Sequence, residues 1–271
     1  MSRSSSKPVK AYRSKSFLAS VAARPLRILS EYLEPKSRFD HYQIEDTIVF
    51  FGSARIISPE QAERELEAAR AGEGDLAAAE MRHELSHYFE ATRELAYRLT
   101  EWSKNLGEGR RRFVVCSGGG PGIMEAANRG ASEAKGVNVG LTISLPEEEF
   151  DNPHITRELR FEFHYFFMRK FWFTYLAKAV VVMPGGFGTL DELFEALTLV
   201  QTQKIRKRMP MVLFGNRYWA DVINFNALVQ YGTIDAEDLD LLFRTDSVDE
   251  AFDYLTEQLS RYAIDQPGPS L

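Results

Sequence analysis

Five short runs of apolar residues divide the chain, and each is rich in residues that favour β-strands. Between them lie longer stretches in which apolar residues recur every three or four positions, as on one face of a helix. The predicted strands are residues 47–51, 112–117, 137–145, 179–183 and 211–214. Because these runs are apolar throughout rather than alternating, they indicate strands covered on both faces. The pattern predicts an α/β fold with an open, mostly parallel sheet and helices on both faces.

The helical pattern also extends in front of the first strand, which predicts an N-terminal helical extension. Residues 1–15 are expected to form a loose tail, followed by a helix over 16–33 that Pro35 stops. The other predicted helices cover residues 59–71, 78–105, 161–175 and 247–263, and two more begin after the glycine loops near Ile123 and Thr189. We therefore expect a tail and docking helix over residues 1–40 and a single domain over 41–265.

Composition and charge narrow the classes of function. The chain has 271 residues, 44% of them hydrophobic, and a formal net charge of −6, which argues against non-specific nucleic-acid binding but not against a small anionic ligand. No apolar run approaches the ~20 residues of a membrane helix, so no membrane partner is expected. The single cysteine, Cys116, ends an apolar run and is interpreted as a buried strand residue in a reducing, cytoplasmic setting. The first thirty residues are basic, with the first acid at Glu31, and we interpret them as a tail and docking helix rather than a transit peptide.

Two glycine loops each follow a predicted strand and open a helix. The first is Ser117-Gly118-Gly119-Gly120-Pro121-Gly122 and the second is Met183-Pro184-Gly185-Gly186-Phe187-Gly188-Thr189. Glycine lets the backbone approach a ligand closely, and a helix start offers free N–H groups to an anion. A tight turn without ligand would also explain the first loop. In the second, Thr189 and Glu192 could form a capping box, which would leave three glycines and the neighbouring Asp191 unexplained.

An aromatic stretch over residues 161–175 contains two cations, Arg169 and Lys170. A helix that is apolar nearly all round must be largely buried, and a buried charge needs a partner. We therefore expect Arg169 to meet a carboxylate or a bound phosphate. The aromatics Tyr165 and Phe166 could stack on a planar base, although core or dimer packing is the preferred explanation.

Together these motifs resemble the LOG (Lonely Guy) family of cytokinin riboside 5′-monophosphate phosphoribohydrolases and related AMP nucleosidases, many of which were formerly mislabelled lysine decarboxylases. The residues from Pro184 to Glu192 match its PGGxGTxxE signature, and Arg169-Lys170 match its RK motif. Residues 50–53 resemble its first strand and turn, and residues 117–122 its GGG loop. The resemblance covers about residues 45–260 and implies a Rossmann-like nucleotide-binding catalytic domain. The long N-terminal extension and the helical insertion at 59–90 depart from short plant-type members.

What the resemblance implies is hydrolysis of the N-glycosidic bond of a nucleoside 5′-monophosphate, AMP or an N6-modified AMP, to free base and ribose 5-phosphate. Glu192 and Arg169 would be the catalytic pair, and no metal or cofactor is needed. The substrate and its phosphate would contact the residues of the glycine loops and their neighbours: Gly185, Gly186, Gly188, Thr189, Ser117, Gly118, Gly119, Gly120, Asp191, Lys170, Ser53 and Asn152.

Two other functions remain open at this point. One is a non-catalytic nucleotide or cofactor carrier of the same superfamily, which need not retain both Arg169 and Glu192. The other, lysine decarboxylation, requires a Schiff-base lysine, and neither Lys170 nor Lys178 lies in a supporting motif. A homodimer or higher homo-oligomer is expected from the aromatic stretch and the resemblance.

Overall fold

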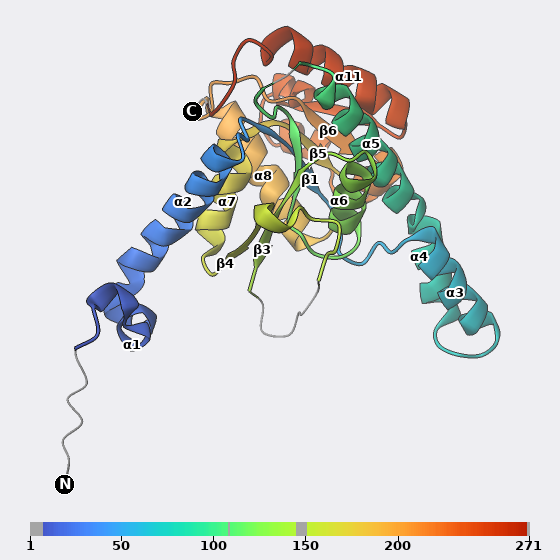
Figure 1. Cartoon of the computed structure of the whole chain (residues 1–271). Coiled ribbons are helices and arrows are strands. Elements are labelled where there is room, and N and C mark those ends of the chain that lie inside the picture. Colours follow the sequence, from blue (N-terminus) through green and yellow to red (C-terminus); the bar gives the residue numbers. More distant parts are fainter. Residues whose placement is uncertain (1–7, 108, 145–150, 270–271) are drawn as a thin grey trace.

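The computed structural model describes residues 8–107, 109–144 and 151–269. Within these residues a seven-stranded sheet has the order β4-β3-β2-β1-β5-β6-β7, and every neighbouring pair is parallel (Figure 1). The strands are β1 (Thr47–Phe51), β2 (Val114–Ser117), β3 (Asn138–Ile143), β4 (Arg160–Phe163), β5 (Ala177–Val182), β6 (Met211–Phe214) and β7 (Leu242–Thr245). The predicted Rossmann-like α/β fold is confirmed.

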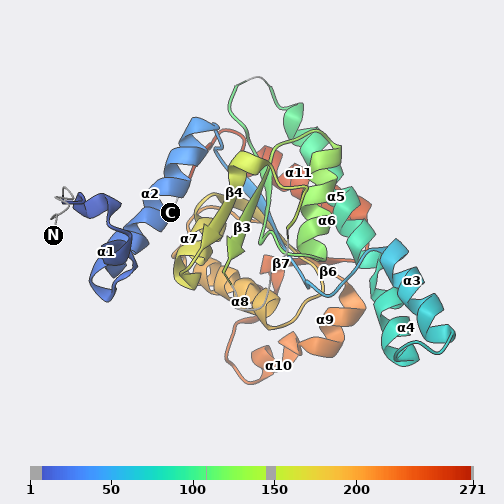
Figure 2. The ribbon, with the colours of Figure 1, turned by 60° about the horizontal axis from the view of Figure 1, so that its bottom comes forward.

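Helices cover both faces of this sheet (Figure 2). One core holds residues of α2, α7, α8 and α10, and the other holds residues of α5, α6 and α11. The α-helices are α1 (Lys15–Ala19), α2 (Arg24–His41), α3 (Pro59–Arg70), α4 (Leu76–Leu85), α5 (His87–Lys104), α6 (Ile123–Glu133), α7 (Phe166–Tyr175), α8 (Phe187–Gln201), α9 (Asn216–Val222), α10 (Phe225–Gln230) and α11 (Val248–Tyr262). All residues of the central strands β1 and β5 are buried, which explains their uninterrupted apolar runs.

The order of the strands creates a switch point beside β1. From β1 the chain builds outward through β2 and β3 to β4 at one edge, then returns across α7 to β5 on the other side of β1. In open parallel sheets, the crevice at such a point, beyond the carboxyl ends of the strands, is where ligands bind. Here it lies between the turn after β1 and the loop after β5.

The expectation that Pro35 ends the first long helix was wrong. Helix α2 runs through Pro35 to His41. A proline inside a helix leaves the carbonyl four residues earlier without its usual N–H donor. That carbonyl belongs to Glu31, and the indole Nε1 of Trp172 donates to it at 2.9 Å. The side chain from α7 therefore replaces the missing hydrogen bond and holds α2 on the sheet domain.

Three other boundaries also differ from those predicted. Residues 160–163 form β4 rather than the start of a helix, with Phe161 and Phe163 buried on alternate positions. The predicted helix over 78–105 is two helices that meet at Ser86, and the predicted helix over 16–33 is interrupted at Ser20. Strand β7 was not predicted, because only two of its four residues are buried and its apolar run is short.

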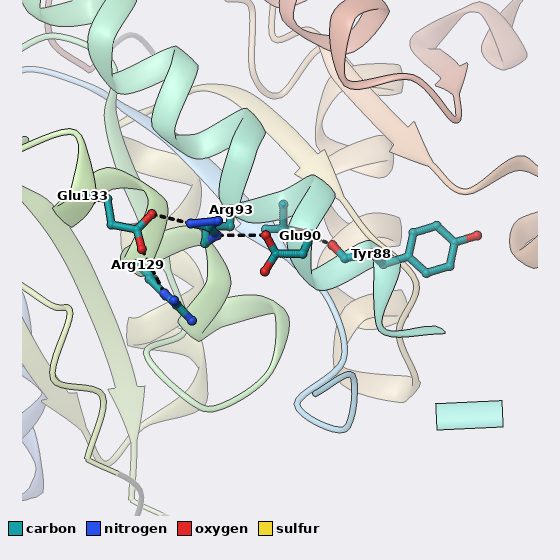
Figure 3. Close-up of polar contacts among 6 residues, drawn as sticks. Tyr88, Glu90, Arg93, Arg129 and Glu133 are labelled. Atoms are coloured by element: carbon teal, nitrogen blue, oxygen red, sulfur yellow. Dashed lines mark hydrogen bonds and ion pairs between the residues drawn. The ribbon is translucent and has the colours of Figure 1, made fainter. Parts of the chain in front are cut away.

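Helices α5 and α6 cross so closely that only glycine fits at Gly130, where an added Cβ would overlap the backbone carbonyl of Arg93. Around this crossing Arg93 bridges Glu90 and Glu133, and Arg129 also pairs with Glu133 (Figure 3). The network is half-exposed and joins α5 to the carboxyl-terminal half of α6.

The amino edge of the sheet is closed by a buried ion pair. Asp46 is 0% exposed, accepts a hydrogen bond from the backbone N–H of Phe113, and lies 2.7 Å from Nε of Arg112. Arg112 also donates to the carbonyl oxygens of Ala263 and Ile264, at 2.7 Å each, which ties the end of α11 to the sheet. The glycine loops lie at the opposite, carboxyl edge of the sheet.

Candidate functional site

The loops that follow β1, β2 and β5 meet at the switch point. The backbone N–H of Ser53, after β1, donates to the carbonyl of Pro184 at 2.9 Å. The N–H of Ile123, at the start of α6, donates to the carbonyl of Ser53 at 3.1 Å. A Cβ at Gly185 would lie 3.0 Å from the Ser53 nitrogen, so this glycine is required by close approach of two backbones. The sequence motifs are thus brought into one cradle.

The start of α8 has no side-chain cap. The helix begins at Phe187 with Gly186 in the N-cap position, and no side chain of the described residues makes a capping hydrogen bond there. The capping box considered for Thr189 and Glu192 is therefore wrong, because both residues lie inside the helix. The first-turn N–H groups have no partner within the helix. A Cβ at Gly186 or Gly188 would meet nothing within 4 Å, so the surface beside these two glycines is open.

Thr189 stabilises the glycine loop that precedes α8. Its residue is 6% exposed, and its hydroxyl packs against Gly185 so closely that an added Cβ there would overlap it. The threonine thus holds the loop in shape from inside the first turn of α8.

The glycine loop after β2 is shaped by the buried hydroxyl of Ser117. This oxygen accepts a hydrogen bond from the N–H of Gly119 at 3.0 Å and donates to Oδ1 of Asn128 at 2.7 Å. Gly119 has φ +70°, a conformation that side chains disfavour. Gly118 and Gly120 fold over Met124, whose side chain would lie 2.7 and 2.8 Å from an added Cβ. Ser117 thus acts within the loop, and the glycine backbone forms its surface.

Asn152 lies behind this loop in a buried amide network. Its Nδ2 donates to Oδ1 of Asn128 at 3.0 Å, and its Oδ1 accepts from the N–H of His154 at 3.1 Å. Asn128 in turn donates to Oδ1 of Asn138 at 2.9 Å. Sequence reasoning missed Asn128 and Asn138, although a buried polar residue among the alanines of α6 was the available signal. The network positions the loop, and the Asn152 amide takes part in it through both its nitrogen and its oxygen.

Helices α7 and α8 bring one cation to three acids. Nζ of Lys170 lies 2.8 Å from Asp191, 2.6 Å from Glu195 and 3.8 Å from Glu192. Glu195 was also missed from the sequence, although it lies one turn after Asp191. Asp191 exposes 60% of its side chain, whereas Glu192 is 7% exposed. Glu192 is therefore the acid of this group that faces inward.

Burial is the main influence on the pKa of the Glu192 carboxyl. It raises the pKa of this carboxyl to about 7, against the opposing attraction of Lys170 and Arg169. No hydrogen bond in the described residues ties its carboxylate to a main-chain amide. A carboxyl that titrates near neutral pH and is not locked into the backbone can accept or release a proton at a ligand.

Arg169 lies on α7 next to Glu192 without an ion pair in the part of the chain that the structure describes. Its guanidinium lies 5.3 Å from the ring of Phe166 and 5.6 Å from that of Phe173, and its buried Nε has no hydrogen-bond partner. Burial lowers its pKa, and Glu192 and Asp191 raise it. Such an unsatisfied donor fits the prediction that Arg169 meets an anion.

The described residues offer no group of three or more histidine, cysteine or acidic side chains that could hold a metal ion. Nor does any helix among them combine the length and apolarity needed to cross a membrane. Cys116 is buried in β2, and burial raises the pKa of its thiol, which suppresses the reactive thiolate. The polar chemistry is therefore concentrated on α7, α8 and the glycine loops.

Comparison with known proteins gives one family match. Residues 124–255 match the family described as "possible lysine decarboxylase", and this segment contains both Arg169 and Glu192. No curated protein sequence matches the chain.

Solved structures are similar only in part. The molybdenum cofactor carrier protein from Chlamydomonas reinhardtii is 16% identical, with a TM-score of 0.46 over 80% of this chain and 99% of that one. The structural-genomics target TM1055 is 21% identical, with a TM-score of 0.48 over 78% and 99%. The molybdenum cofactor binding protein from Rippkaea orientalis is 18% identical, with a TM-score of 0.39 over 62% and 88%.

Proposed function

We propose that the protein is a nucleotide N-glycosidase, because residues 124–255 match the family described as possible lysine decarboxylase and carry the motifs that resemble the LOG family. Its substrate is a nucleoside 5′-monophosphate, AMP or an N6-modified AMP, and its products are the free base and ribose 5-phosphate. The observation that carries the proposal is Glu192: a buried carboxyl of pKa about 7, free of main-chain amides, beside the unpaired Arg169.

The 5′-phosphate is placed at the start of α8. The uncapped N–H groups there, and the positive end of the helix dipole, favour a dianion. The surface beside Gly186 and Gly188 is open, and Ser53 joins this loop to the start of α6 behind the other glycine loop. Binding the phosphate in this way fixes the ribose relative to α8 and holds its anomeric carbon near Glu192.

Hydrolysis then breaks one bond and forms another at the anomeric carbon. The C1′–N bond breaks with its electron pair leaving on the base, and positive charge develops on the ribose. The Glu192 carboxylate stabilises that charge and takes a proton from the attacking water, whose oxygen forms the new bond to C1′. The departing base takes up one proton, so the products are neutral base and ribose 5-phosphate.

Three charged residues near Glu192 have separate roles in the proposed reaction. Arg169 contacts the substrate and balances the negative charge that builds on the departing base. Lys170 holds the three carboxylates together and lowers the pKa of Glu192 against the effect of burial. Asp191, with its exposed side chain, is available to the ribose hydroxyls.

The family's descriptive name does not fit the lysines of this chain. Lysine decarboxylation through a Schiff base needs an amine that is free to react. Lys170 is engaged by three carboxylates. Lys178 is buried near Asp46 and Arg112, at the amino edge of the sheet and away from the glycine loops. Neither lysine therefore fits the role of a Schiff-base amine.

The test is release of free base from a panel of nucleoside monophosphates. Glu192→Gln should lower the rate of adenine release from AMP by at least ~100-fold while AMP still binds in calorimetry, because a general base is removed and the phosphate cradle is kept. The matched variant Glu195→Gln, on the same helix, should lose less, since its carboxylate only holds Lys170. Tight AMP binding by the unaltered protein without base release would instead indicate a carrier, and full activity of Glu192→Gln would refute the assignment.

A further inference from the structure

The glycine loop before α8 is held by a hydroxyl from α9, a helix that carries none of the sequence motifs. Tyr218 of α9 donates a hydrogen bond to the carbonyl oxygen of Gly185 at 3.0 Å. Among the described residues this carbonyl receives no other hydrogen bond. Burial raises the pKa of the Tyr218 hydroxyl, so the group keeps its proton at neutral pH and can act as the donor. This contact joins α9 directly to the loop of the candidate site.

The carbonyl that Tyr218 holds belongs to the same peptide unit as the N–H of Gly186. The described residues contain no cis peptide bond, and in a planar trans unit the C=O and the N–H point in opposite directions. Fixing the Gly185 oxygen toward α9 therefore fixes the Gly186 N–H on the side away from α9. That N–H donates to no acceptor within the part of the chain that the structure describes.

The peptide units before and after this one are fixed by backbone groups. The carbonyl of Pro184 accepts a hydrogen bond from the N–H of Ser53 at 2.9 Å, and the carbonyl of Gly186 accepts one from the N–H of Leu190 at 3.0 Å. Of three consecutive carbonyls, only the middle one depends on a side chain, that of Tyr218. The middle unit also lies between two glycines, whose backbones rotate more freely than those of other residues. It is therefore the unit that loss of the tyrosine hydroxyl would release.

Helix α9 is itself anchored at its start, so Tyr218 is held on a fixed support. The Asp246 carboxylate, after β7, accepts hydrogen bonds from the backbone N–H of Asn216 at 2.7 Å and from its side-chain amide at 2.8 Å. The indole of Trp219 donates to the carbonyl of Phe214, at the end of β6, at 2.9 Å. The ends of β6 and β7 thus position the tyrosine that in turn positions the glycine loop.

We propose that Tyr218 is a positioning residue for the phosphate of the substrate. Its bond to the Gly185 carbonyl orients the Gly186 N–H so that this N–H donates to a phosphate oxygen at the start of α8. The inference rests on the proposed function only in placing a phosphate ester there. Tyr218 acts through the loop and not on the ligand, because its hydroxyl and the Gly186 N–H lie on opposite sides of one peptide unit.

Tyr218→Phe tests this role, because it removes one oxygen and keeps the ring. The Kd of ribose 5-phosphate and the KM of AMP should both rise by ~5–10-fold, while kcat changes by less than ~2-fold, since one hydrogen bond to the phosphate is misaligned and Glu192 is untouched. If Tyr218 only stabilised the fold, the variant would instead lower the folded fraction, and with it kcat, and leave KM unchanged.

Tyr231→Phe is the matched control. This tyrosine is 84% exposed, and its hydroxyl forms no hydrogen bond in the described residues. The control should reproduce the Kd, KM and kcat of the unaltered protein.

Calorimetry with ribose 5-phosphate separates failure of this inference from failure of the proposed function. If AMP binds but no adenine is released, the proposed function fails, and the ratio of the two Kd values, Tyr218→Phe to unaltered, still decides the inference. A ratio of ~5–10 supports the role of Tyr218, and a ratio near 1 overturns it. Absence of ribose 5-phosphate binding to the unaltered protein would overturn it as well.

Discussion

At the scale of single residues, the site keeps two groups that burial penalises. Glu192 is 7% exposed with its pKa raised to about 7, and Arg169 has a buried Nε without a partner. Burying polar groups that are not fully paired costs free energy, and proteins retain such groups mainly where function needs them. The identities of both residues followed from the sequence motifs. Their state did not, because it depends on how α7 and α8 exclude water.

The free-energy cost of burying the charged Glu192 carboxylate should appear in the pH dependence of the stability of the fold. Because its pKa in the folded protein, about 7, lies above the ordinary 4.5, the folded state binds the proton more tightly than the unfolded chain. The penalty is therefore absent below pH 4.5, grows as the pH rises to 7, and stays constant above. Glu192→Gln should raise the free energy of unfolding at pH 8 by up to ~3 kcal/mol more than at pH 4.5. Urea unfolding at both pH values measures this, and an equal effect at both would contradict it.

At the scale of elements, the glycine loops were predicted and their geometry was not. The apolar runs were sufficient for five strands, because burial on both faces leaves a strong pattern. They failed at β7, where burial is partial, and at α2, where a side chain from α7 compensates for Pro35. The capping box failed as well, since α8 has its N-cap at Gly186, three residues earlier than the threonine pattern suggests. Long-range contacts decide each of these cases.

Two glycines of one loop should respond differently to the same substitution. Gly185→Ala should destabilise the fold by ~1–3 kcal/mol, because its Cβ would overlap Thr189 and press on the Ser53 backbone. Gly188→Ala should leave stability nearly unchanged but weaken AMP binding, because its Cβ would enter the open space before the helix start. Thermal unfolding and calorimetric titration with AMP measure the two effects. Unchanged AMP affinity of Gly188→Ala would show that the space at Gly188 has no part in binding.

At the scale of the whole molecule, the topology separates a closed edge from an open one. The amino edge is tied by Asp46 and Arg112 to the end of α11. The carboxyl edge collects the loops of β1, β2 and β5, and the return crossover from β4 to β5 carries Arg169 to the same place. The order of strands was not predictable from apolar runs, which give the elements and not their neighbours. Once the order is known, the position of the candidate site follows from the switch point.

The uncapped start of α8 and the buried Nε of Arg169 would both be satisfied by a bound dianion. A ligand held in this way binds the folded state and not the unfolded chain, so it stabilises the fold. Ribose 5-phosphate should therefore raise the melting temperature in proportion to the logarithm of its concentration, and by ~2.7 kcal/mol of stability at a hundred times its Kd. Ribose should have no such effect at equal concentration. Heating curves recorded against a library of phosphate esters would then rank unknown ligands without any assay of turnover.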